Sequence, residues 1–122
     1  ESFVLKHVLQ NLFVNAIEAI AASGKAAGTI AVSASTRQLD GEAFIDPAIR
    51  DDGIGIAAEH LADIFKRGFS TKKESKRGAG LHWCANSVTA MNGKIFAESA
   101  GINQGATLHV LLKRADTSTN TA

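Results

Sequence analysis

The first 22 residues carry an apolar pattern with helical spacing, and a helix of this length needs a surface to cover it. From Phe3 to Ala22 the apolar residues recur at intervals of three and four, at Leu5, Leu9, Leu12, Phe13, Ala16 and Ile20. This spacing predicts one amphipathic helix of about 20 residues with a single apolar face. The rest of the chain must therefore supply a second layer against that face.

Alternating apolar and polar residues after Gly28 predict a pair of antiparallel strands. The stretches "TIAVSAST" and "AFIDPAIR" both alternate, and "LDGE" between them contains an Asp-Gly hairpin turn. Pro47 makes the second strand a weaker prediction than the first, because proline has no N–H to donate to a ladder.

The second half of the chain predicts two helices and a second strand pair. "AAEHLADIF" indicates a short helix, and "KRGFSTKKESKRGAG" is a lysine-rich loop without periodicity. "LHWCANSVTAMNG" indicates a helix closed by Asn-Gly, while "KIFAESA" and "ATLHVLLK" indicate strands joined by "GINQG". This order predicts an α+β fold, a two-layer sandwich with helices on one face of the sheet. We expect one domain over residues 1–114 and a polar tail over residues 115–122.

Composition excludes several classes of protein. The 122 residues are 45% hydrophobic and 20% charged, which fits one globular domain. Thirteen Lys+Arg against twelve Asp+Glu give a net charge of +1, so no global field favours nucleic acid or an anionic membrane. The single cysteine, Cys84, excludes an internal disulfide and is compatible with a cytoplasmic location. Because the chain starts at Glu1 inside a helical pattern, we expect it to be part of a longer protein, whose other parts could include a membrane anchor.

The first predicted helix also carries a polar stripe along one edge of its apolar face. Asn11, Asn15 and Glu18 follow one another at helical spacing, with His7 one turn earlier. Such residues often form only the solvated margin of a core face. Two asparagines in mid-helix instead suggest a further task, because asparagine is a modest helix former. An amide oxygen can bind Mg²⁺ when phosphates and water supply the other ligands.

Four short motifs, taken together in this order, resemble a known family. "LQNLFVNAIEA", "DDGIGI", "IFKRGFSTK" and "GAGLHW" resemble the N, G1, F and G2 boxes of the ATP-binding catalytic domain of sensor histidine kinases. These kinases belong to a superfamily with gyrase, the ninety-kilodalton heat-shock chaperone and MutL. The resemblance covers roughly Leu5 to Lys113 and implies the Bergerat fold, a mixed, mostly antiparallel sheet with helices on one face. Pro47 would lie in the strand that leads to the G1 box, and we expect a local irregularity there.

The resemblance implies a nucleotide-binding role for the residues around "DDGIGI". Asp51 matches the aspartate that accepts the exocyclic amine of adenine and would repel the carbonyl of guanine. Gly53 and Gly55 would let the backbone approach the base, and Ile56 would line the site. On the sequence alone, an Asp-Asp-Gly turn after a strand is the competing interpretation. We interpret Asp52 as a residue that caps the turn or is exposed.

The N box implies a magnesium site without a strong base. Asn15 matches the asparagine that holds Mg²⁺ between the phosphates, with Asn11 and Glu18 beside it in the nucleotide site. In the gyrase-like ATPases and the anti-sigma serine kinases, a glutamate four residues before that asparagine serves as the general base. Asn11 occupies this position here, and an amide cannot accept a proton near neutral pH. This difference favours phosphoryl transfer to a histidine, which is already a nucleophile when neutral.

The lysine-rich segment from Lys66 to Gly80 resembles the family's ATP lid. Lys72 is the strongest candidate for a phosphate contact and a catalytic role. Further candidates for nucleotide contacts are Phe69, Ser70, Thr71, Gly78, Gly80 and Leu81. The cluster of positive charge could instead bind nucleic acid or simply be solvated. "GAGLHW" also resembles a dinucleotide-binding fingerprint, but the third glycine is absent and no strand precedes it. His82 and Trp83 depart from the common G2 form, which puts contacts beyond Leu81 in doubt.

The resemblance therefore predicts the catalytic half of a two-component sensor histidine kinase. Such a domain binds Mg·ATP and donates the γ-phosphoryl group to a histidine on a separate dimerisation domain of the parent protein. The implied partners are ATP or ADP, that phosphoacceptor domain and the receiver domain of a response regulator, with no nucleic acid and no direct membrane contact. The alternatives are a conformational ATPase or a nucleotide-binding module without kinase activity. None of the four histidines, His7, His60, His82 and His109, lies in the setting of a phosphoacceptor.

Overall fold

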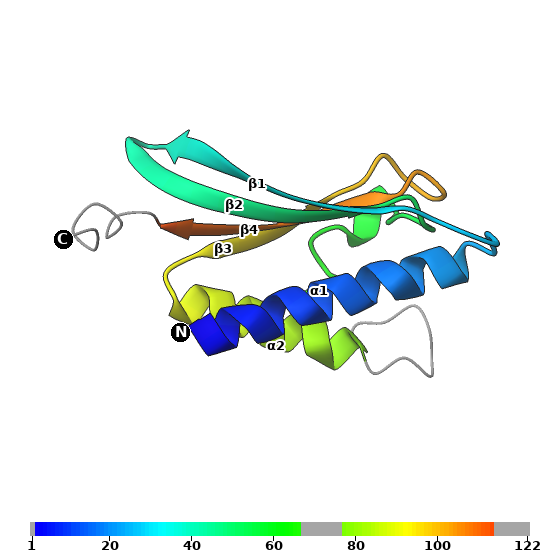
Figure 1. Ribbon diagram of the computed structural model, residues 1–122, viewed down its shortest axis with the longest axis horizontal. Helices are drawn as coiled ribbons and strands as arrows, with labels where there is room; N and C mark the ends of the chain where they lie inside the picture. The colour runs from blue at the N-terminus through cyan, green and yellow to red at the C-terminus, as the bar shows by residue number, and fades with distance from the viewer. Residues whose placement is uncertain (1, 67–76, 114–122) are drawn as a thin grey trace.

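The protein is a two-layer arrangement of a sheet and two helices. The computed structural model describes residues 2–66 and 77–113. The elements are α1 (Ser2–Ala22), β1 (Ile30–Leu39), β2 (Glu42–Asp51), the 3₁₀ helix η1 (Ala58–His60), α2 (Arg77–Ala90), β3 (Lys94–Glu98) and β4 (Ala106–Lys113). Both helices lie on the same face of the sheet (Figure 1), which confirms the predicted α+β sandwich. No helix in the described part of the chain is long and apolar enough to cross a membrane.

The four strands form one sheet in the order β1-β2-β4-β3. All three pairings between the described strands are antiparallel, so the expected mixed sheet is antiparallel throughout these residues. Short connections explain two of the pairings, because neighbouring strands joined by a tight loop must run in opposite directions. The turn between β1 and β2 has Asp40 and Gly41 at positive φ, which is the geometry that an Asp-Gly hairpin favours.

Pro47 produces the expected irregularity in β2, on one side of the strand. Its pairing with Ala34 of β1 is part of an unbroken ladder. On the β4 side, the paired residues flank Asp46 and Pro47 and leave both out, while Ile45 pairs with Leu112 and Ala48 with His109 in an unchanged register. The missing N–H of proline is thus accommodated by a gap in one ladder and not by a bulge.

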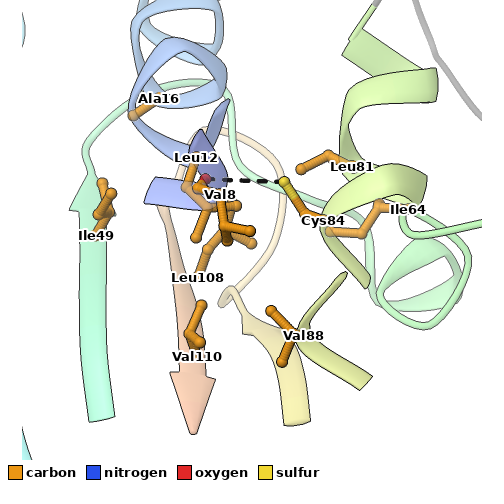
Figure 2. Packing of buried hydrophobic residues seen from close by; sticks show 10 residues of the cluster. All are labelled: Val8, Leu12, Ala16, Ile49, Ile64, Leu81, Cys84, Val88, Leu108 and Val110. Atoms are coloured by element: carbon orange, nitrogen blue, oxygen red, sulfur yellow. Dashed lines mark hydrogen bonds between the residues drawn. The ribbon is translucent and has the colours of Figure 1, made fainter. Parts of the chain in front are cut away.

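The core lies between the helices and the sheet. Figure 2 shows Val8, Leu12 and Ala16 of α1 and Leu81, Cys84 and Val88 of α2 in one cluster with the strand residues Ile49, Leu108 and Val110. The Cys84 thiol lies 3.8 Å from the Val8 carbonyl oxygen, and burial raises the pKa of this thiol to about 12. The prediction that Phe13 belongs to the buried face of α1 was wrong, since its side chain is 42% exposed. Val8 lies one turn before Leu12 and is fully buried instead.

The end of α1 follows a local sequence signal, whereas the bounds of the other two helices differ from those predicted. Gly24, at positive φ, donates to the Ala21 carbonyl just after α1 ends, as expected of a glycine at this position. Helix α2 starts at Arg77, four residues earlier than predicted, so Gly78 and Gly80 lie within its first turn. The helix predicted over residues 57–65 is shorter: one 3₁₀ turn is followed by hydrogen-bonded turns as far as Lys66.

The face of the sheet away from the helices carries a row of linked polar and charged side chains, one from each strand. Arg37 Nε donates to Asp46 Oδ2 at 2.8 Å. The ring of His109 lies between two carboxyls, with Nδ1 3.0 Å from Asp46 Oδ2 and Nε2 2.8 Å from Glu98 Oε1. The ring of Phe96 stacks on His109 with the centroids 4.5 Å apart. Asp46 and His109 are buried, and the row satisfies both. His109 therefore has a structural role.

Candidate functional site

Three segments meet beside the end of β2. The segment Gly53–Ile56 leaves β2, and the Ile54 N–H donates to the Ala19 carbonyl of α1 at 2.9 Å. From the other side, the loop between β3 and β4 donates to the same residue, through the Asn103 N–H to the Ile54 carbonyl at 2.5 Å. Figure 1 shows this end of α1 and the two loops at the same end of the molecule. The segment predicted to bind nucleotide is thus held between a helix and a loop.

Asp51 is a buried carboxyl at the base of this segment. It is 5% exposed, and its Oδ1 accepts a hydrogen bond from the Gly53 N–H at 2.8 Å. Burial raises the pKa of Asp51 above the ordinary value of 3.8, and the neighbouring charge of Asp52 adds to this. Backbone donors at Gly53 and Ala106 oppose the rise. A carboxylate has about four acceptor positions, so these two donors leave capacity for a ligand donor such as an amine.

Asp52 points elsewhere and fastens the connection between α1 and β1. Its Oδ1 accepts from the Thr29 N–H at 2.9 Å, and Lys25 Nζ lies 3.4 Å from its Oδ2. The Thr29 backbone donor and then Lys25 lower the pKa of Asp52, despite some desolvation. Asp52 is partly exposed, as one of the two interpretations from the sequence allowed, and its carboxyl is bonded to the connection between α1 and β1 instead of capping the turn that follows it.

The glycines of "DDGIGI" are required by contacts within the protein. A Cβ placed on Gly53 would lie 2.5 Å from the Ala19 backbone of α1. A Cβ on Gly55, which has a φ of 75°, would collide with the Gly101 carbonyl of the β3–β4 loop. Close approach to a base, which the sequence suggested, is therefore not needed to explain either glycine.

The polar edge of α1 lies on a half-buried part of the helix. Asn11, Asn15 and Glu18 are all half-buried, and Asn11 Nδ2 donates to the His7 carbonyl at 3.0 Å. Within residues 2–66 and 77–113, no hydrogen bond involves the Asn15 side chain, and no buried side-chain N or O atom lacks a partner. Among these residues, none competes with a ligand for the Asn15 amide, which fits a residue that would bind a metal ion or a phosphate. The described residues hold no group of three or more His, Cys, Asp or Glu that could bind a metal ion.

Part of the G2 box lies in the first turn of α2. Gly78 and Gly80 lie in this turn, while Leu81 is 7% exposed and belongs to the core. His82, the departure from the common G2 form, lies 3.3 Å from the Phe65 carbonyl through Nδ1 and so joins α2 to the segment after η1. Four predicted residues, Phe69, Ser70, Thr71 and Lys72, lie outside the described residues.

Sequence reasoning missed the loop between β3 and β4, residues 99–105. The stretch "GINQG" indicated only a hairpin turn, yet Ser99, Gly101 and Gly105 all contact the segment after β2. The two glycines within five residues were a signal of a specific loop conformation, and both have positive φ in the structure. No pattern in the sequence indicated where that loop would lie.

The fold and the buried carboxyl agree with one family of proteins. Residues 2–116 match the model of the family described as histidine kinase-, DNA gyrase B-, and HSP90-like ATPase. The chain belongs to this ATPase family. The resemblance stated from four short motifs is thereby confirmed over nearly the whole chain.

Several proteins with sequences similar to this chain are sensor kinases. The sensor histidine kinase ZraS of Klebsiella oxytoca is 38% identical over 96 residues, which cover 79% of this chain and 19% of ZraS. The catalytic domain of histidine kinase ThkA has a TM-score of 0.73 at 26% identity, covering 92% of this chain and 67% of that chain. Full-length ShkA, solved in complex with AMPPNP, has a TM-score of 0.72 at 26% identity, covering 89% of this chain and 21% of that chain.

These relatives define what the chain corresponds to. It aligns with the ATP-binding catalytic domain of histidine kinases and spans about a fifth of the length of ZraS. The similarity to sensor histidine kinases agrees with the resemblance predicted from the N, G1, F and G2 boxes.

Proposed function

We propose that the chain is the catalytic domain of a two-component sensor histidine kinase, and that it binds Mg·ATP and donates the γ-phosphoryl group to a histidine on a separate dimerisation domain. The observation that supports this most is the buried Asp51 carboxyl, fixed by the Gly53 N–H, in a chain of this ATPase family. We assign residues 1–114 to the working domain and residues 115–122 to a polar tail.

Asp51 would select adenine. An ionised carboxylate only accepts hydrogen bonds, so it can pair with the exocyclic amine of adenine but not with the carbonyl oxygen that guanine has there. Its burial strengthens this preference, because a hydrogen bond to a charged group is worth more where water is excluded. The Gly53 N–H holds the carboxylate in one orientation and so reduces the cost of ordering it on binding.

Asn15 would hold the metal ion that accompanies the phosphates. Its amide is available on a half-buried helix surface, and Mg²⁺ accepts one protein oxygen when phosphate and water supply its other ligands. When bound, magnesium would neutralise charge on the phosphates. Asn11 and Glu18 lie along the same edge of α1, and Lys72 would add positive charge from the lid.

The absence of a carboxylate at position 11 favours histidine over water or serine as the acceptor of the phosphoryl group. Asn11 cannot take a proton from water or from a serine hydroxyl near neutral pH. A neutral imidazole needs no such base, because its unprotonated nitrogen forms the new bond to phosphorus directly. The bond from phosphorus to the ADP oxygen breaks, and the imidazole releases its N–H proton to solvent. Catalysis would then consist mostly of positioning and of charge stabilisation.

The parent protein would supply what this chain lacks. We assign the phosphoacceptor histidine to a dimerisation domain of the parent, and the onward acceptor to the receiver domain of a response regulator. The domain would work in the cytoplasm, where ATP is present, whether or not the parent is anchored in a membrane.

Calorimetric titration of Mg·ATP into the chain and into two variants tests the nucleotide site. Asp51→Asn should weaken binding by about 10- to 150-fold, since a hydrogen bond to a charged group contributes about 1.5 to 3 kcal/mol. Asp52→Asn is the matched control, because it removes the same charge from the adjacent residue, whose carboxyl is bonded to Thr29 and Lys25. It should change the affinity by less than about 3-fold. Equal affinities for Asp51→Asn and the unchanged chain would refute the assignment.

A further inference from the structure

The β3–β4 loop forms the wall behind the segment Gly53–Ile56. The Gly105 N–H donates to the Gly53 carbonyl at 3.2 Å, and the Asn103 N–H donates to the Ile54 carbonyl. Gly55 has no room for a Cβ because of the Gly101 carbonyl, and Gly105 has none because of the Asp51 carbonyl. The two segments are therefore in direct backbone contact, so a displacement of the loop would displace the residues next to Asp51.

The Ser99 hydroxyl connects the two segments through a side chain. Its Oγ accepts from the Ile56 N–H at 3.0 Å and from the Gly101 N–H at 3.2 Å, and it donates to the Gly105 carbonyl at 2.6 Å. A hydroxyl has one donor and two acceptor positions, so these three bonds use its full capacity. Ser99 is half-buried and is the first residue after β3, so its backbone directly follows a residue that is paired in the sheet.

The Ile56 N–H has a defined place because of this bond. Ile56 lies beyond the last strand residue of β2, and its N–H partner is a side chain 43 residues away in sequence. Without the hydroxyl, a half-buried N–H would lose its partner, and the segment would be free to shift toward solvent to regain one. The loop itself would also lose two of the bonds that shape it, at Gly101 and Gly105.

We propose that Ser99 is a positioning residue for nucleotide binding, which holds Gly53–Ile56 in the place where Asp51 can read adenine. This inference rests on the proposed function, because it assigns the segment to the adenine site. Ser99 acts through Ile56 and does not itself contact the nucleotide. Removing the hydroxyl should therefore reduce both the affinity for ATP and the preference for ATP over GTP.

The test compares Mg·ATP and Mg·GTP affinities of the chain and its variants by calorimetry. Ser99→Ala and Ser99→Cys both remove the strong hydrogen-bonding group, and Cys nearly preserves the volume. Each should weaken ATP binding by about 3- to 10-fold and lower the ratio of ATP to GTP affinity. Ser99→Thr retains a hydroxyl and should stay within about 2-fold of the unchanged chain. Ser35→Ala, on an exposed part of β1, is the matched control and should change neither affinity.

Amide hydrogen exchange at Ile56 shows whether the intended bond was removed. Faster exchange at Ile56 in Ser99→Ala, together with weaker ATP binding and a lower ATP/GTP ratio, supports the proposal. Faster exchange with unchanged ATP affinity overturns it and leaves the proposed function intact. A parallel loss of ATP and GTP affinity also overturns it, because a purely structural role would reduce both equally. If the unchanged chain binds no ATP, the proposed function fails and this inference fails with it.

Discussion

Asp51 and Asp52 are neighbours in the sequence, yet their carboxyls lie in different surroundings. Asp51 is the last residue of β2 and is buried, whereas Asp52 is bonded to Thr29 and Lys25 on the surface. The sequence alone predicted two carboxylates at a turn, and the family resemblance chose Asp51 as the adenine acceptor. Neither the sequence nor the resemblance could predict the partners of Asp52, because they depend on where the connection between α1 and β1 lies. The two carboxyls therefore do not form one site together.

The two carboxyls should titrate in a predictable order. Burial raises the pKa of Asp51 above 3.8, while the Thr29 N–H and Lys25 lower the pKa of Asp52. Carbon-13 NMR of the side-chain carboxyls across acidic pH should therefore show Asp51 titrating at the higher pH. The reverse order would contradict the burial of Asp51.

These shifts also fix the sign of each contribution to stability. The folded chain keeps a proton on Asp51 at pH values where the unfolded chain has lost it, so this group reduces stability as pH rises from about 3.8 through the raised pKa. Asp52 stabilises the fold above its ordinary pKa, and that contribution is lost as pH falls through the lowered pKa. ATP binding needs ionised Asp51 and should strengthen as pH rises through the raised pKa.

At the scale of elements, periodicity predicted the regular segments, and contacts between distant segments were not predictable. The long helix, both strand pairs and the Asp-Gly turn follow from local patterns, which is why they agree with the structure. The choice of Val8 over Phe13 for the core depends on a small rotation of α1 against the sheet. The position of the β3–β4 loop behind Gly53–Ile56 depends on the order of strands in the sheet. Neither the rotation of α1 nor the order of the strands can be predicted from a short stretch of residues.

Contact between α1 and the segment after β2 makes Gly53 a sensitive position. In Gly53→Ala the new Cβ would meet Ala19 backbone atoms, which cannot rotate away as a side chain can. Urea denaturation should show a loss of about 2 to 3 kcal/mol in the free energy of unfolding, as expected of overpacking. Amide exchange at Ile54 should become faster, because its bond to Ala19 would be strained.

Gly41→Ala provides the comparison for this variant. Gly41 has a φ of 82° and nothing within 4 Å of an added Cβ, so the cost should be only that of a left-handed backbone, about 1 kcal/mol. Exchange at Ile54 should stay unchanged in this variant. A smaller loss for Gly53→Ala than for Gly41→Ala would mean that α1 and the segment are not in close contact.

At the scale of the whole molecule, the sheet separates two kinds of chemistry. The apolar core lies on the helix side of the sheet, with the candidate nucleotide site at one end. The other face carries the row of linked side chains from Arg37 to Glu98. That row links all four strands through side chains, and sequence reasoning placed His109 in a strand without identifying its partners. Because α1 is packed on the core through Leu12 and Ala16, Asn15 is carried by an element that cannot easily move away from the sheet.

The most direct measurement of the central claim is phosphoryl transfer from radiolabelled Mg·ATP to a separately expressed dimerisation domain of the parent protein. The chain should transfer the label to a histidine of that domain, giving a phosphoramidate that acid hydrolyses and base does not. The transfer should require both proteins and should be strongly reduced by Asp51→Asn. Release of free phosphate by the chain, with no label on histidine, would instead show that it is a conformational ATPase and would contradict the proposed function.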